Sequence, residues 1–133
     1  MIKKTNTSVL QILVLVLLGV LANPAYAKWT KLMSYNDTDF YVELETIKQG
    51  WTIVSYRLLE NYQGGDFVGE SSVQSIEVNC RTKHHRMVRA DYYSKHFGRG
   101  KKIDYLTEDW IYPTDGSVAD YLDRGVCGYL SSK

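Results

Sequence analysis

The segment 51–62 reads WTIVSYRLLENY and is followed at 63–66 by QGGD. The first segment is rich in β-branched and aromatic residues, which suit the pleated, half-buried surface of a strand. The paired glycines of QGGD accept positive φ angles without strain, so this segment predicts a hairpin turn. A further strand is therefore expected from about Phe67 to Gln74, continuing or breaking near Ser75.

Upstream of this hairpin, the segment 40–45 (FYVELE) alternates between apolar and polar residues. Phe40, Val42 and Leu44 would share one face, which is the pattern of a half-buried strand. The residues Lys48–Gly50 predict the turn that leads into the segment 51–62.

Downstream of the hairpin, Ile76, Val78 and Cys80 alternate with polar residues and would share one face of an extended segment. The other segments that we expect are strands at 86–93, 103–106 and 110–112, and a glycine-rich connection at 97–100. The segment 110–112 ends at Pro113, which cannot continue a central strand.

A helix is expected near the C-terminal end of the chain. Ser117 fits its N-cap, with Asp120 three residues further on. The apolar residues that recur at helical spacing are Val118, Tyr121, Leu122 and Val126. Cys127 would lie at the end of this helix, and Cys80 on a strand.

Residues 1–27 resemble an export signal, with Lys3 and Lys4, an apolar run over 9–20 and an Ala-Tyr-Ala site at 25–27. The apolar run is shorter than the roughly 20 residues that span a membrane. We therefore expect a cleaved signal peptide, followed by one domain at 28–133 with no stable membrane span. The product would be exported, either periplasmic or secreted.

Export gives the two cysteines a role, because disulfides persist in oxidising compartments. Cys80 and Cys127 are the only cysteines in the chain, so a disulfide between them is expected to fasten the helix to the sheet. Closing that loop would stabilise the fold by about 4 kcal/mol in the chain-entropy model.

The net charge of +1 conceals an uneven distribution. The segment 81–102 carries eight Lys and Arg residues against one acid, Asp91, whereas the rest of 28–133 carries six against fourteen acids. Such a basic stretch predicts a macromolecular ligand, either a protein or a polyanion. The candidate binding residues are Arg81, Lys83, His84, Arg86, Arg89, Lys95, Arg99, Lys101 and Lys102. The alternative is a solvated strand pair in which lysines protect an exposed edge and alternation divides the charges between two faces.

Catalytic and metal sites are not indicated. Adjacent residues of a strand point to opposite faces, so His84 and His85 could hardly bind one ion, and the surrounding positive charge disfavours a cation. His96 completes the only metal-like cluster. Acid–base cleavage of a phosphodiester by these histidines has no support beyond composition. The chain lacks a nucleophile elbow and a phosphate loop. We therefore expect no metal, no cofactor and no enzymatic activity.

Several segments in their shared order resemble the surface-adhesin protein E family. They are Trp29, FYVELETIK at 40–48, VSYRLLENY at 54–62, EVNC at 77–80, the glycines at 98 and 100, Trp110 with Pro113, and Cys127. The resemblance covers most of 29–127. It implies an α+β fold with an antiparallel sheet of about six strands and a C-terminal helix tied to the sheet by the cysteines.

The same resemblance implies a homodimer and binding to host matrix and serum proteins. The namesake is lipid-anchored at the cell surface, whereas residues 1–27 contain no cysteine for lipid attachment, so surface display does not follow. The alternative hypothesis is a periplasmic inhibitor of a cell-wall hydrolase or a toxin, since such inhibitors are often small, disulfide-bonded and rich in strands.

Overall fold

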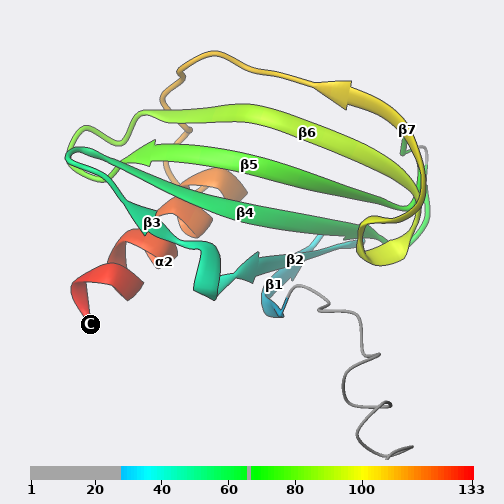
Figure 1. Ribbon diagram of the computed structural model, residues 1–133, viewed down its shortest axis with the longest axis horizontal. Coiled ribbons are helices and arrows are strands. Elements are labelled where there is room, and N and C mark those ends of the chain that lie inside the picture. Colours follow the sequence, from blue (N-terminus) through cyan, green and yellow to red (C-terminus); the bar gives the residue numbers. More distant parts are fainter. Residues whose placement is uncertain (1–27, 66) are drawn as a thin grey trace, which may run out of the picture.

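The structure, a computed structural model, describes residues 28–65 and 67–133, which form one antiparallel sheet and one α-helix (Figure 1). The predicted signal peptide and Asp66 of the predicted turn lie outside these residues. The elements are β1 (Trp29–Tyr35), β2 (Thr38–Glu43), the 3-10 helix η1 (Leu44–Thr46), β3 (Lys48–Gln49), β4 (Ile53–Tyr62), β5 (Ser71–Asn79), β6 (His85–Lys95), the 3-10 helix η2 (His96–Gly98), β7 (Arg99–Leu106) and α2 (Val118–Ser131). The strand order is β1-β2-β4-β5-β6-β7, with the short β3 also paired to β4. The predicted α+β fold class is confirmed.

The sheet has two unlike faces, and α2 packs on one of them, the helix face. Cross-strand neighbours such as Val54 and Val78, or Tyr56 and Ile76, place apolar side chains on this face. From α2, Leu122 and Val126 are 1% and 2% exposed and complete the core. The opposite face, the open face, carries mostly polar and charged side chains. The alternation predicted for 40–45 and 76–80 therefore holds for the buried residues of β2 and β5.

α2 begins where the sequence predicts. The Ser117 hydroxyl accepts a hydrogen bond from the Asp120 backbone N–H at 3.2 Å, and the Asp120 carboxylate accepts one from the Gly116 N–H at 2.9 Å. The helix continues to Ser131, so Cys127 lies inside it and not at its end. Tyr121 was expected on the packed face but is 53% exposed, because the buried face of α2 is formed by Asp120, Leu122, Asp123 and Val126, and Tyr121 lies on the opposite side of the helix.

The predicted disulfide is confirmed. Cys80 and Cys127 are bonded, with their Cα atoms 5.9 Å apart. Cys80 itself lies one residue beyond the end of β5, in the turn before β6. A buried polar cluster adds a second link between α2 and the sheet. The Tyr56 hydroxyl donates to one oxygen of Asp123 at 2.7 Å, and His85 Nδ1 lies 2.8 Å from the other.

Several strand boundaries differ from prediction, and each difference has a local cause. Lys48 and Gln49 form β3 and are not the turn, which is closed by the hydrogen bond from the Gly50 N–H to the Ile53 carbonyl. The segment 40–45 stops being a strand after Glu43, because η1 follows. The strand expected from Phe67 begins only at Ser71.

Three further differences concern the edges of the sheet. β1 was not predicted at all, because the sequence WTKLMSY lacks a regular alternation and its register shifts between Lys31 and Met33. β7 is longer than the predicted 103–106. The segment 110–112 makes only one bridge, between Ile111 and His85. The strand that was expected to continue or break near Ser75 continues through it as β5, with a register shift between Ser75 and Ile76 in its pairing to β6.

Candidate functional site

The structure divides the predicted basic residues into three groups along β6. This strand has 11 residues and is therefore about 35 Å long. The first group, Arg81, Lys83 and His84, lies at the β5–β6 turn. The second, Arg86, Arg89 and Lys102, lies on the open face. The third, Lys95, Arg99 and Lys101, lies at the β6–β7 hairpin. The nine residues are therefore not one continuous patch.

Acids on the sheet neutralise the second group. Arg86 Nη2 lies 2.5 Å from a Glu77 oxygen, and Arg89 Nε lies 2.7 Å from an oxygen of Asp91. Lys102 Nζ lies 3.3 Å from the other Asp91 oxygen. Partial burial acts to raise the pKa of the Asp91 carboxyl, but the hydrogen bonds from Arg89 and Lys102 outweigh it and hold this pKa below its usual range. Each of these three cations is thus paired with a carboxylate of the protein itself.

The third group, Lys95, Arg99 and Lys101, is called the hairpin cluster. Aromatic rings lie beside it: the Arg99 guanidinium is 5.7 Å from the Phe97 ring centre, and the neighbouring Lys102 ammonium, which is paired with Asp91, is 5.9 Å from that of Tyr93. Every residue of β7 is exposed, and β6 is its only sheet neighbour in the described chain.

The turn that carries the hairpin cluster folds back over the open face, where η2 packs on β4 and β5. The Asn61 side-chain oxygen accepts a hydrogen bond from the Phe97 N–H at 2.8 Å. The Ser71 hydroxyl accepts one from the Gly98 N–H at 3.0 Å and donates to the Lys95 carbonyl at 2.6 Å. Leu59, on the open face, is fully buried as a result. These hydrogen bonds therefore hold the turn that carries the hairpin cluster in a fixed position on the sheet.

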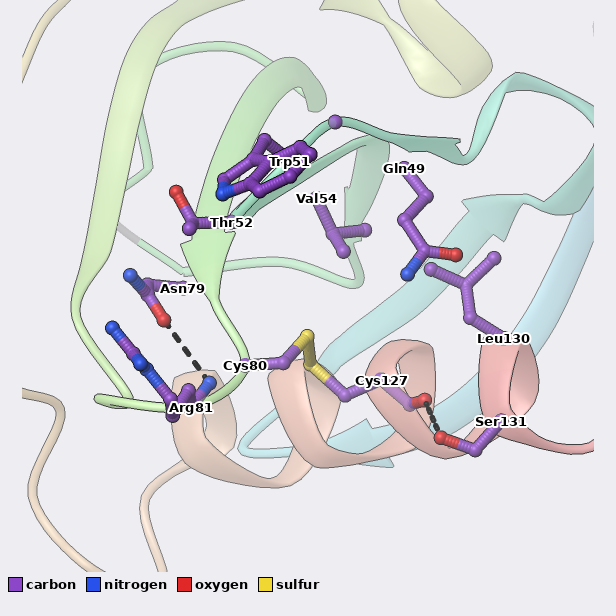
Figure 2. A pocket seen from close by; sticks show the side chains of 11 residues that line it. Gln49, Trp51, Thr52, Val54, Asn79, Cys80, Arg81, Cys127, Leu130 and Ser131 are labelled. Carbon is purple, nitrogen blue, oxygen red and sulfur yellow. Dashed lines mark hydrogen bonds between the residues drawn. A yellow bond between two sulfur atoms is a disulfide. The ribbon is translucent and has the colours of Figure 1, made fainter.

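Arg81, from the first group, lies at a hollow of about 390 Å³ beside the disulfide (Figure 2). Figure 2 shows Trp51 and the Cys80–Cys127 bond on either side of this hollow, with Arg81 next to Cys80. Arg81 is its only charged lining residue within the described chain. The sequence predicts Trp51 inside a strand, whereas its side chain is 100% exposed in the β3–β4 turn. Its position directly after Gly50 was the signal for a turn residue.

The three histidines lie apart. His84 packs against the Tyr112 ring, with ring centres 3.9 Å apart. His85 is buried against Asp123, and the His96 ring Nε2 lies 2.8 Å from the Tyr62 carbonyl oxygen. Across 28–65 and 67–133, His, Cys, Asp and Glu side chains nowhere gather in threes in a way that could hold a metal ion.

None of the helices in the described part of the chain is both long and apolar enough to cross a membrane. A sheet with one open face and a helix that a disulfide joins to the sheet define the class: a small, disulfide-bonded α+β domain.

The chain belongs to the surface-adhesin protein E family, whose model matches residues 29–128. Solved structures of Haemophilus influenzae protein E share the fold. Its crystal form II has a TM-score of 0.64 at 18% identity, covering 81% of this chain and 93% of that one. Another structure of the same protein has a TM-score of 0.59 at 20% identity, covering 83% and 91%. A search of curated proteins finds no match. Family membership makes the chain an adhesin-like protein.

Proposed function

We propose that this chain is an exported, non-enzymatic adhesin domain that binds a host matrix or serum protein through its basic surface. The observation that carries this proposal is the hairpin cluster of Lys95, Arg99 and Lys101. Family membership supports the general role, and the geometry supports this position for the contact.

Exposure and charge both favour a protein contact at the hairpin cluster. Beside the cluster, β7 exposes Ile103 and Tyr105 by 49% and 58%. Basic groups next to exposed apolar side chains suit an acidic protein surface, which gains both electrostatic steering and buried area on binding. Arg and aromatic residues are also the types that most often dominate the energy of an interface. Because the cations are exposed, the interaction should weaken with added salt.

The test compares two double variants that change the net charge equally. Arg99→Glu/Lys101→Glu alters the hairpin cluster, whereas Lys28→Glu/Lys48→Glu alters exposed lysines elsewhere. Binding to immobilised matrix proteins, serum proteins and heparin is measured at about 0.1 M and about 0.5 M salt. We expect the first variant to lose binding and the second to keep it. Equal binding by both variants and at both salt concentrations would refute the proposal.

Trp51 and Arg81 offer a second contact region at the opposite end of β6. Trp51→Ala should weaken binding without changing stability beyond about 0.5 kcal/mol, because the side chain is fully exposed. A variant that binds normally removes this region from the proposed interface and leaves the hairpin cluster as the sole contact.

The remaining parts of the proposal have their own measurements. Fractionation of the native cells tests export to the periplasm or beyond. Sedimentation velocity tests the homodimer, and a cell-wall hydrolase assay with the purified protein tests the inhibitor alternative. Potent inhibition together with an absence of matrix or serum protein binding would favour that alternative.

A further inference from the structure

The helix face contains a groove that α2 leaves uncovered. α2 has 14 residues and is about 21 Å long, whereas the ten residues of β4 extend about 33 Å. The helix therefore covers only part of the strand. The covered part includes Tyr56, whose hydroxyl donates a hydrogen bond to Asp123 of α2. Beyond Tyr56 lies a groove of about 390 Å³ between the sheet, the first turn of α2 and the segment that follows β7.

The walls of this groove are mostly apolar. Leu58, Met87 and Leu106 line it from the sheet, Ile111 from the segment after β7, and Val118 from α2. Ligand sites in proteins are typically apolar clefts of roughly 300–1,000 Å³ that contain a few convergent polar groups. The size and lining of this groove fit that description.

Glu60 supplies the convergent polar group. It lies on the helix face, opposite Phe40 on β2 and Ser72 on β5. The Tyr62 hydroxyl donates a hydrogen bond to its carboxylate at 2.9 Å and fixes its position. Burial raises the pKa of Glu60, although the hydrogen bonds from Tyr62, Gln74 and Ser72 act in the opposite direction. A carboxylate in this setting is incompletely compensated and would gain from a cationic partner.

The charges around the groove have one sign. Glu60 and Glu108 line it, and no Lys or Arg does so within the described chain. His85, which also lines it, directs its Nδ1 to the buried Asp123. The pKa of Tyr92, another lining residue, is raised by burial and by the negative charges of Glu60 and Glu108. The field in the groove therefore favours a cation.

We propose that this groove binds a small amphipathic primary amine, with its alkyl chain on Leu58 and Met87 and its ammonium group at Glu60. This site lies on the face opposite the open one and does not depend on the adhesin proposal. A hydrocarbon chain would cover the apolar walls, and an ammonium–carboxylate contact is the stronger, charge-assisted type of hydrogen bond.

The test uses three probes that share one chain length: n-hexylamine, n-hexanol and n-hexanoate. Each is titrated into the purified protein at about pH 8, where a primary amine is still protonated. Binding is followed by calorimetry and by backbone amide shifts in NMR. We expect n-hexylamine to bind most tightly and hexanoate most weakly, with shifts at the groove. Tighter binding of hexanoate, or shifts confined to other surfaces, would overturn the proposal.

Two substitutions test the charge of Glu60 and the volume of the groove separately. Glu60→Gln keeps the shape of the side chain and should weaken the binding of n-hexylamine by about tenfold or more, with n-hexanol unaffected. Glu77→Gln, a carboxylate of the open face, is the matched control and should leave both unchanged. Ala119→Phe narrows the groove from α2 and should weaken both probes. Unchanged hexylamine affinity in folded Glu60→Gln contradicts the proposal, and so does full binding by folded Ala119→Phe.

Discussion

The disulfide offers the most direct test of what holds this domain together. The perturbation is Cys80→Ser/Cys127→Ser, which removes the bond without leaving a reactive thiol. The two residues are 47 positions apart in the sequence. For a loop of this length, the chain-entropy model gives a loss of about 4 kcal/mol at room temperature. Small domains have net stabilities of about 5–15 kcal/mol, so the variant should still fold but with a much smaller margin.

Other contacts of α2 with the sheet should remain in the variant without the disulfide. α2 keeps its buried residues Leu122 and Val126, and Asp123 keeps its hydrogen bonds to Tyr56 and His85. We therefore expect the helix to remain docked in the folded variant. The loss of stability would then come mainly from the greater freedom of the unfolded chain.

The assay is urea unfolding followed by circular dichroism, combined with native-state hydrogen exchange. If the bond acts on the unfolded state, protection of the slowest amides should fall by a similar amount in α2, β4 and β5. A loss in the free energy of unfolding below about 1 kcal/mol would refute the entropy argument. Reduced protection confined to α2, with the sheet unchanged, would show that the bond acts by local docking.

Three other predictions concern single residues. Ser117→Ala removes the N-cap of α2 and should lower the free energy of unfolding by about 1 kcal/mol in urea, and an unchanged value would contradict the capping role. Gly69→Ala places a Cβ against the Tyr93 carbonyl oxygen at a φ of +79°, whereas Gly64→Ala, at a φ of +125°, meets no atom within 4 Å. The first should therefore lower the thermal midpoint more than the second, and the reverse order would refute the overlap. Because burial raises the pKa of Glu60 in the folded state, its contribution to stability is present at low pH and is lost as the pH rises through that pKa. The free energy of unfolding of the parent minus that of Glu60→Gln should decrease between about pH 4 and pH 8, and a constant difference would contradict the sign.

Local sequence patterns predicted much of the fold. The alternation of Phe40 and Val42, or of Ile76 and Val78, depends only on the two-residue period of a strand, and these residues are buried as expected. The Ser117 cap depends on neighbouring atoms and is also correct. The edge strand β1 was missed because its pairing partner, and not its own pattern, makes it a strand.

The arrangement of the basic segment 81–102 depends on tertiary structure. A count of charges over 81–102 identified a basic stretch but left open whether its residues form one patch. The length of β6 separates Arg81 from Lys95, and pairing across the sheet gives Arg86 and Arg89 acidic partners. Glu77 and Asp91, which neutralise them, are recognisable as partners only once the strand register is known.

The sequence by itself determined the fold class, the family and the disulfide. Periodicity and local capping indicated individual strands and the helix, the shared order of motifs from Trp29 to Cys127 indicated the family and the sheet that it implies, and the chain has only two cysteines to pair. The tertiary structure alone decided which charges remain free, that Trp51 is exposed and that α2 leaves a groove with Glu60 inside it. These features depend on distances between segments that are far apart in the chain. Such distances are set by strand register and by the length of α2 relative to the sheet, and no local pattern encodes them.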